Sequence, residues 1–351
     1  MIQHNKPTVE PDDIEEVSKV LDSGWIVQGK KVDEFEKAVC DYLGIDGQGI
    51  AVSSGTAALY LALFSLGIGK GDKVILPTYV CSALLNAIFF TGAIPILVDV
   101  NLNDFNISFE KTRKKIEGKT KAIIVPHIYG TPADIDKFIK LEIPIIEDCA
   151  QSIGARKGDQ MVGTFGDISV FSFYATKMLT TGQGGMIVSR APEIIGKIKD
   201  FREFDYRREY KVRFNLQMTD MQAALGLSQL RKLPNFIESR RTIAKRYTEV
   251  LSRSGRNLML QEVSDNKKSV YYRFVMRSKN GIERIRKLFQ ENGIQTIVPV
   301  ETFELLHKYL KLNGDDFKNS EELAKTTLSV PIYPTLKEAE ISKIMRIMGK
   351  I

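Results

Sequence analysis

The stretch Phe171-Ser-Phe-Tyr-Ala-Thr-Lys177, followed by Met178-Leu-Thr-Thr-Gly-Gln-Gly-Gly185, decides the fold. The apolar run 168–173 is too short for a helix and predicts a buried strand. The glycines after the lysine predict a turn in which positive φ angles are available, before a second strand at 186–189. Lysines are almost never fully buried without a partner, so a lysine at this position needs a reason. A desolvated, neutral amine can form a Schiff base with a carbonyl; a surface lysine that begins a hairpin is the alternative.

The composition narrows the class of protein. The chain has 351 residues, a net charge of +7, 43% hydrophobic and 26% charged residues, which favours a globular protein of two domains. The first residues lack the apolar core of a signal peptide and no apolar run reaches membrane-spanning length, so we expect a cytoplasmic protein with no membrane partner. Three scattered cysteines fit a reducing compartment, and the three histidines lack metal-ligand spacing, so we expect no metal. No nucleic-acid-binding motif is present, so we expect no nucleic-acid partner.

From Ile50 onward, short apolar strands alternate with helices. Strands are expected at residues 50–53, 73–76, 94–98, 121–125 and 143–146. This alternation predicts a mainly parallel sheet with both faces covered by helices. A helix that begins near Thr219 is expected to be interrupted at Pro234 and followed by a second helix to residue 252. The remainder predicts a smaller α+β unit, with a strand at 270–276, a helix at 282–292, a short strand near 295–298 and a terminal helix from 337.

The predicted fold is therefore α/β, with residues 1–235 as an N-terminal arm and large domain and residues 236–351 as a small α+β domain. Ligands of such sheets bind beyond the carboxyl ends of the strands. Four features fall at these ends: Ser54-Gly55-Thr56, Tyr79, Asp148 and Lys177. We expect them to share one edge of the sheet.

Each of these features has a functional and a structural interpretation. The helix after Ser54 offers free amides that can bind a phosphate, or Ser54 is only a helix cap. Asp148 could hold a ring nitrogen protonated through a charge-assisted hydrogen bond, or form a structural salt bridge. Tyr79 could lie over a flat ligand, or be a core aromatic. A lysine nucleophile, a phosphate-binding helix start, an acid and a stacking ring are together what pyridoxal 5'-phosphate (PLP) requires.

The sequence resembles the DegT/DnrJ/StrS family of sugar aminotransferases, which are PLP-dependent transferases of fold type I. The resemblance extends from Gly24 to about Pro331 and includes an intact lysine, whereas some relatives carry histidine there and are dehydratases. It rests on these motifs: Gly24-Trp25, Gly29, Phe35-Glu36, Ser54-Gly-Thr-Ala-Ala-Leu59, Gly71-Asp72, Glu147-Asp-Cys-Ala-Gln-Ser152, Gly154-Ala155, Phe171-Ser-Phe173, Lys177, Thr181-Gly182, Gly184-Gly185 and Gln222-Ala-Ala-Leu225.

The resemblance implies a role for each candidate residue. Lys177 would carry the cofactor as a Schiff base and move a proton, and Asp148 would pair with the pyridine nitrogen. Asn215 would reach the phosphate of the neighbouring subunit, which implies a homodimer with shared active sites. The remaining cofactor contacts would be Ser54, Gly55, Thr56 and Ser172 at the phosphate, Gln151 near the ring hydroxyl and Tyr79 on the ring face.

The implied activity is transfer of an amino group from an amino acid, with L-glutamate as the expected donor, to a ketone of a nucleotide-linked deoxysugar. The alternatives are an aminotransferase for a smaller phosphorylated or cyclitol ketone, and a non-enzymatic sensor that keeps the fold. The chain departs from the family pattern at Asn215-Leu-Gln-Met218, at Gln183 and around Ile297-Val-Pro299. These departures concern the substrate rather than the cofactor. The arginine-rich stretch 202–213 could contact substrate phosphates or be a solvated loop.

Overall fold

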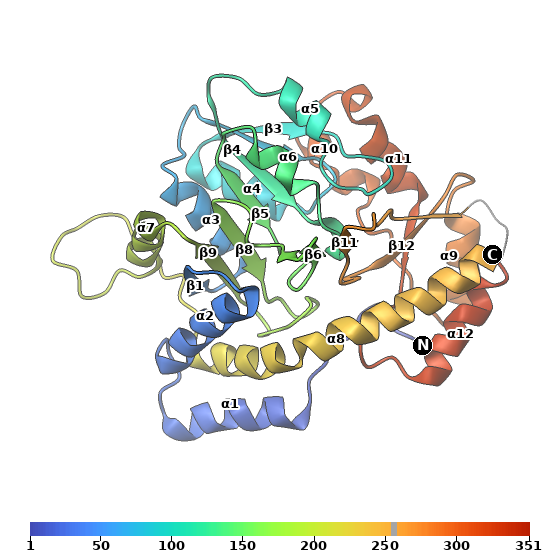
Figure 1. The fold of residues 1–351 in the computed structure, drawn as a ribbon, viewed down its shortest axis with the longest axis horizontal. Coiled ribbons are helices and arrows are strands. Elements are labelled where there is room, and N and C mark those ends of the chain that lie inside the picture. Colours follow the sequence, from blue (N-terminus) through green and yellow to red (C-terminus); the bar gives the residue numbers. More distant parts are fainter. Residues whose placement is uncertain (254–257) are drawn as a thin grey trace.

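A computed structural model describes residues 1–253 and 258–351, and its centre is a seven-stranded sheet. All neighbouring strands are parallel except β9, which is antiparallel to both of its neighbours, so the predicted, mainly parallel sheet is confirmed. Figure 1 shows the sheet in the middle of the molecule. Its spatial order is β1 (Gln48–Val52), β9 (Gly185–Ser189), β8 (Ile168–Ser172), β5 (Ile145–Asp148), β4 (Thr120–Pro126), β2 (Lys73–Pro77) and β3 (Ile94–Val98).

Helices cover the sheet as the alternating pattern predicts. Helix α3 (Gly55–Ser65) is apolar on almost every side and packs against α4 (Ala83–Thr91) and α7 (Pro192–Arg202) in the main core. A helix that is hydrophobic all round is a buried one, and α3 follows this rule. Among the other helices, α2 (Lys30–Leu43) packs against β1, and α1 (Pro11–Ser23), α5 (Phe109–Lys114) and α6 (Ile135–Ile139) complete the N-terminal part.

Helix α8 (Asp220–Arg253) corrects one prediction, because it continues without interruption through Pro234. A proline inside a helix removes one hydrogen bond and costs about 3 kcal/mol, so packing must compensate. The N-terminal half of α8 lies against α1 and α2, and its C-terminal half belongs to the core around α12 (Glu338–Met348). The predicted domain boundary at residues 235 and 236 therefore falls inside one helix that spans both parts of the molecule (Figure 1).

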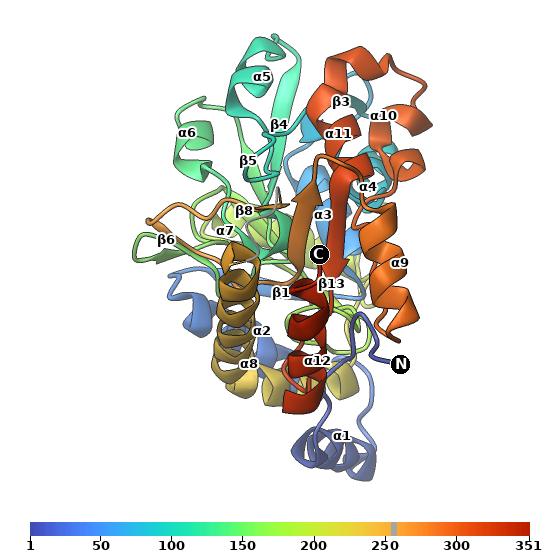
Figure 2. The same cartoon turned by 90° about the vertical axis from the view of Figure 1, so that its right-hand side faces the viewer.

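The C-terminal part contains a small antiparallel sheet in the order β10 (Leu258–Leu260), β12 (Phe274–Ser278) and β13 (Thr327–Val330), next to α9 (Glu283–Glu291) and α12 (Figure 2). The strand predicted at 270–276 begins only at Phe274, and the strand predicted near 295–298 is an isolated bridge between Ile297 and Ser329. Strand β13 was not predicted. A second small sheet joins β6 (Arg156–Lys157), β7 (Gln160–Met161) and β11 (Lys267–Lys268).

The segment before β13 returns to the large domain, so the C-terminal part is not wholly separate. Leu305, Phe317 and Leu323 are buried in the same core as α3. The segment consists of η2 (Thr302–Glu304), α10 (Leu306–Tyr309), η3 (Gly314–Phe317) and α11 (Lys318–Thr326). No described helix is both long enough and apolar enough to cross a membrane.

The N-terminal arm connects the small sheet region with the lysine loop. Ile2 forms a parallel bridge with Ile294, and the side-chain amide of Asn5 donates a hydrogen bond to the Thr176 carbonyl at 3.1 Å. Because Thr176 directly precedes Lys177, the arm holds the backbone beside the candidate nucleophile.

Candidate active site

The carboxyl ends of β5 and β8 bring two predicted site residues together. The strands are parallel neighbours, with Asp148 paired to Val170, so Asp148 and Ser172 lie at the same edge of the sheet. Both residues therefore lie at the carboxyl ends of their strands, where sheets of this kind bind ligands.

The start of α3 reaches the same edge through two close glycine contacts. A Cβ atom on Gly55 would lie 2.8 Å from the Ser172 Cβ, and a Cβ on Gly185 would lie 2.4 Å from the Ser54 carbonyl oxygen. Side chains at either glycine would push the helix away from β8 and β9. The Ser54 side chain accepts a hydrogen bond from the Ala57 amide at 3.1 Å, so its oxygen caps the helix as the structural interpretation predicted.

This arrangement fits a phosphate group. The first amides of a helix have no acceptor within the helix and carry the positive end of its dipole. Gly55 and Thr56 provide those amides in α3, and the half-buried Ser172 hydroxyl lies beside them. A side chain in place of Gly55 would collide with Ser172 beside these donors, so the residues present are compatible with the phosphate of PLP.

Lys177 lies in the loop after β8, half-buried, with its Nζ 5.1 Å from the centre of the Tyr272 ring. No carboxylate of the described residues is within ion-pair distance of this amine. Asp148 is buried, and one of its carboxylate oxygens accepts a hydrogen bond from the Ala150 amide at 3.0 Å. Burial raises the pKa of the Asp148 carboxyl, while the Ala150 amide and the positive charge of Lys177 oppose this rise. The two main candidates thus belong to one electrostatic site.

Gln151 lies on the loop that follows Asp148. Its side-chain oxygen accepts a hydrogen bond from the Tyr129 amide at 2.8 Å, which leaves its NH₂ group available as a donor. Tyr129 itself has a φ of 58°, an uncommon backbone conformation for a residue other than glycine. Such outliers concentrate near functional sites, and Tyr129 follows the end of β4 at the same edge.

Tyr79 does not occupy the position that the sequence predicted. Its side chain is completely buried, its hydroxyl is 3.0 Å from the Thr327 hydroxyl, and its ring packs edge-on against Tyr129. This geometry is that of a core aromatic and does not favour stacking on a cofactor. Cys81 is the accessible residue of this segment. Desolvation by the surrounding protein raises the pKa of the Cys81 thiol. The charge of Asp148 raises this pKa further, and the charge of Lys177 lowers it. Cys81, which no sequence pattern marked, therefore lies within electrostatic range of both main candidates.

Asn215 is exposed, and its side chain forms no hydrogen bond with any residue that the structure describes. Its neighbour Phe214 packs against Tyr60 and Phe64 of α3. The asparagine is thus held on the surface beside α3, with both polar atoms free to contact another molecule.

Residues 202–213, the basic segment, divide into paired and unpaired cations. Arg202 is buried and binds Glu36 at 2.7 Å, and Arg213 binds Asp200 at 2.9 Å. Arg207 lies 3.3 Å from Glu203. Among the described residues, no carboxylate lies within ion-pair distance of Arg208, which is exposed on the loop that projects from the body after α7 (Figure 1).

A buried group of His127, Glu147 and Cys149 has the composition of a metal site but is structural. The His127 Nδ1 accepts a hydrogen bond from the Ala133 amide, so Nε2 carries the proton and donates to Glu147 at 3.0 Å. Both ring nitrogens are therefore occupied. The Glu147 oxygens also accept hydrogen bonds from three backbone amides, those of Gly163, Phe165 and Gly166.

Two residues near the candidate nucleophile, Tyr272 and Arg273, were not predicted from the sequence. Tyr272 is buried beside Lys177. The guanidinium carbon of Arg273 lies 5.2 Å from the centre of the same ring. Burial raises the pKa of Tyr272, but the charges of Lys177 and Arg273 outweigh it and lower the pKa to about 8. These residues lie almost a hundred positions after the lysine, and the aromatic run Tyr271-Tyr272 is the only local signal.

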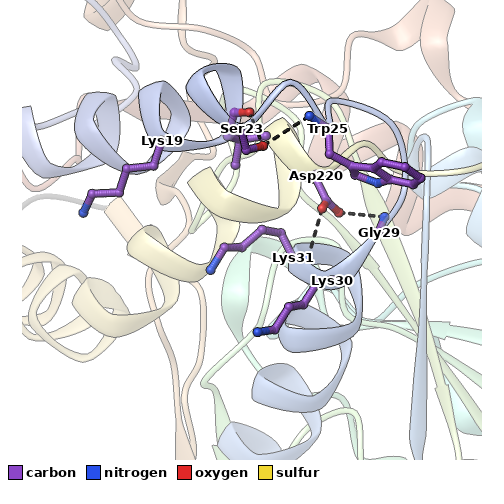
Figure 3. Close-up of a pocket in the computed structure, with 8 residues that line it drawn as sticks. Lys19, Ser23, Trp25, Gly29, Lys30, Lys31 and Asp220 are labelled. Atoms are coloured by element: carbon purple, nitrogen blue, oxygen red, sulfur yellow. Dashed lines mark hydrogen bonds between the residues drawn. The ribbon is translucent and has the colours of Figure 1, made fainter.

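A separate pocket of about 390 Å³ lies between α1 and α2, lined by Lys19, Lys30, Lys31 and Trp25 (Figure 3). The Asp220 carboxylate accepts hydrogen bonds there from the amides of Gly29, Lys31 and Val32. The positive end of α2 is thus already neutralised, and no predicted cofactor residue lines this pocket.

Comparison with known proteins identifies the family. The family model described as "DegT/DnrJ/EryC1/StrS aminotransferase family" matches residues 7–349. GDP-perosamine synthase of Caulobacter vibrioides is 32% identical, with 98% of this chain and 96% of the relative covered. dTDP-3-amino-3,6-dideoxy-alpha-D-galactopyranose transaminase of Aneurinibacillus thermoaerophilus is 33% identical, with 95% and 93% covered.

A solved structure gives the same answer for the fold and the cofactor. The PLP form of the putative sugar aminotransferase Spr1654 of Streptococcus pneumoniae superposes with a TM-score of 0.92 at 25% identity, covering 99% of this chain and 97% of that one. The predicted fold type, PLP dependence and transaminase activity are confirmed. The chain, which has a lysine, a buried carboxylate and the start of a helix at one sheet edge, belongs to the DegT/DnrJ/EryC1/StrS family of PLP-dependent aminotransferases.

Proposed function

We propose that this aminotransferase moves the amino group of an amino acid, with L-glutamate as donor, to a ketone of a nucleotide-linked sugar. The observation that carries the proposal is the convergence of Lys177, Asp148 and the start of α3 at one edge of the sheet. The nucleotide-sugar part is supported by the names of the two curated relatives. PLP supplies an electron sink for the carbon that is attached to the transferred nitrogen.

Each residue has a defined task in this proposal. The α3 amides at Gly55 and Thr56 bind the phosphate together with the Ser172 hydroxyl. The Asp148 carboxylate accepts a hydrogen bond from the protonated ring nitrogen, and its burial strengthens that charge-assisted bond. The Lys177 amine holds the cofactor at rest and, once released, carries a proton to or from the substrate carbon. The Gln151 NH₂ group donates to the ring hydroxyl.

The proposed working unit is a homodimer in which each active site uses both chains. Large apolar side chains are exposed on two segments, at Trp25, Ile26 and Val27 and at Phe204, Tyr206, Tyr210 and Val212. Exposed apolar patches of this kind mark association surfaces. Asn215 adjoins the second segment with its side chain free, which supports a contact with the partner's cofactor phosphate.

Two experiments test the proposal. The first follows conversion of L-glutamate to 2-oxoglutarate by the PLP-loaded protein, then offers a panel of keto sugars with and without a nucleotide, and smaller phosphorylated or cyclitol ketones. Turnover restricted to the smaller ketones would assign the substrate to the alternative class. Failure of the glutamate step with every amino acid offered would leave a sensor.

The second experiment tests the shared site by complementation. Lys177→Ala and Asn215→Ala should each be inactive as homodimers, and mixing them after unfolding should restore about a quarter of the wild-type sites, because only half of the dimers are mixed and each has one intact site. A mixture as inactive as its parents would mean that Asn215 serves its own chain.

A further inference from the structure

Two cations lie over the ring of Tyr272, and neither forms an ion pair with a carboxylate of the described residues. Lys177 Nζ and the Arg273 guanidinium carbon are 5.1 and 5.2 Å from the ring centre. Within residues 1–253 and 258–351, neither side chain has a carboxylate within ion-pair distance. Arg240, buried nearby, donates hydrogen bonds only to backbone carbonyls, including that of Ile332 at 2.6 Å. Positive charge therefore exceeds negative charge around this ring.

Both cations are half-buried, and an anion bound beside them would compensate their charge. Removing an unpaired charge from water is costly, and buried charges are normally compensated. The same charges act on a neighbouring residue: burial and the charges of Arg273 and Arg240 lower the pKa of His4, which contacts Ser329, to about 3. The low pKa of Tyr272 has the same origin. A ligand that supplies negative charge would relieve both effects.

Two anions that the reaction brings have no binding residue among those described so far, the carboxylate of the amino-acid donor and the diphosphate of the nucleotide, and the exposed Arg208 is a candidate for the second. The cofactor phosphate has the α3 amides and Ser172, and the cofactor ring has Asp148. An amino-acid donor brings its nitrogen to the position of the Lys177 amine, and its carboxylates follow a few bonds away. Arg273 is the unpaired arginine that shares a ring contact with that amine.

We infer that Arg273 binds a carboxylate of the amino-acid donor and that the Tyr272 ring holds the guanidinium in place for it. This inference rests on the proposed function and adds to it the residue that recognises the amino-acid donor. The planar guanidinium matches a carboxylate with two parallel hydrogen bonds. Contact with the Tyr272 face restricts the arginine side chain before the donor arrives, which reduces the entropy lost on binding.

The test uses glutarate, a dicarboxylate with the carbon chain of glutamate but no amine, so binding is measured without reaction. Calorimetry on the PLP-loaded protein should show that Arg273→Gln weakens glutarate binding at least about tenfold. Arg273→Lys, which keeps the charge but loses the fork, should fall between that variant and wild type. The matched control is Arg284→Gln, an exposed arginine on α9, which should bind glutarate as wild type does. The neutral diamide of glutarate should bind all four proteins equally weakly.

Kinetics provide a second readout. Arg273→Gln should raise the KM for L-glutamate and leave the KM for the keto substrate unchanged. Equal glutarate affinity in wild type and Arg273→Gln would overturn the inference. If Arg273→Gln instead bound PLP more weakly and glutarate as wild type does, the inference would also be wrong, because Arg273 would then bind the cofactor phosphate. Arg273→Lys decides the question if the glutamine variant does not fold. Absence of PLP bound to Lys177 would instead refute the proposed function, because glutarate binding is measured independently of turnover.

Discussion

Ser172 lies so close to Gly55 that a Cβ atom on residue 55 would be 2.8 Å from the Ser172 Cβ and 3.1 Å from its hydroxyl oxygen. Real side chains do not approach so closely, so a substitution must separate α3 from β8. Gly55→Ala is therefore expected to weaken PLP binding at least about tenfold by moving the phosphate-binding amides away from the serine, an overpacking effect. Fluorescence titration of the cofactor-free protein with PLP measures this.

The control for this substitution is Gly196→Ala in α7, where a new methyl group would meet no atom within 4 Å. It should bind PLP as wild type does and be more stable by roughly 0.5–1 kcal/mol, because alanine favours the helix. Equal PLP affinity of the Gly55→Ala variant and wild type would show that this close contact does not shape the phosphate site.

Lys177 should be the residue that carries the cofactor. The purified, PLP-loaded protein should be yellow, and borohydride reduction followed by peptide mapping should place PLP on Lys177. Lys177→Ala should abolish turnover yet still bind PLP through α3, Ser172 and Asp148. The exposed Lys70 provides the control, since Lys70→Ala should keep both the colour and the activity. A label on any other lysine would contradict the assignment.

Part of the site could be predicted from strand ends alone. Asp148 follows one apolar run and Ser172 lies near the end of another, and parallel strands place such residues at one edge whatever the rest of the chain does. The same rule could not separate Tyr79 from Cys81, because the pattern does not say which way each side chain turns once the strand has ended. The structure turns Tyr79 into the core and leaves Cys81 at the site.

Other features depend on packing between distant segments. Pro234 is a local signal for a break, but contacts with α1, α2 and α12 hold α8 together on either side of it. Arg273 is unremarkable in its own neighbourhood of the sequence. It becomes a candidate only because the fold places it and Lys177 against one ring and places no carboxylate of the described residues beside either.

Asp148 should make the stability of the cofactor-free protein depend on pH. Burial raises the pKa of this carboxyl in the folded state, although the Ala150 amide and Lys177 oppose it. The folded state then holds the proton more tightly than the unfolded state, so the contribution of Asp148 to stability falls as pH rises above the unfolded value of about 3.9. Urea unfolding at a series of pH values should show that Asp148→Asn lacks this part of the decline.

The same variant tests the role of Asp148 toward the cofactor. Asparagine keeps the shape but cannot hold the ring nitrogen protonated by charge, so the glutamate half-reaction should slow by about two orders of magnitude or more. Wild-type rates in Asp148→Asn would leave the carboxylate with a structural role only.

Glu147, the neighbour of Asp148, should stabilise the folded protein through its hydrogen bonds. Its two oxygens accept bonds from His127 and from three backbone amides inside the protein. In Glu147→Gln, one oxygen becomes an NH₂ group that faces N–H donors, which should lower the free energy of unfolding by about 3–5 kcal/mol. Glu15→Gln, at an exposed ion pair with Lys19, should cost less than about 1 kcal/mol. A Glu147→Gln variant of wild-type stability would contradict a structural role.

Arg208 is the cation of the basic segment that we expect to contact the nucleotide diphosphate of a substrate bound mainly to the partner subunit. Arg207 and Arg213 already have Glu203 and Asp200 as partners, whereas no described carboxylate pairs with Arg208. A contact near 4 Å at an effective dielectric constant of about 20 is worth about 4 kcal/mol before desolvation is subtracted. Arg208→Ala should therefore raise the KM for the nucleotide sugar at least about tenfold, leave the glutamate half-reaction unchanged, and have a smaller effect at high salt.

Arg207→Ala is the matched control for Arg208, because it removes an arginine from the adjacent position of the same exposed loop. Glu203 already neutralises part of the charge of Arg207, so Arg207 attracts a phosphate less strongly. Because exposed ion pairs have a small net energy, the KM of Arg207→Ala for the nucleotide sugar should change less than about threefold. If both variants raise the KM equally, the segment acts through its total charge rather than through one contact. If neither does, the basic segment is solvated loop, and the nucleotide must be recognised elsewhere.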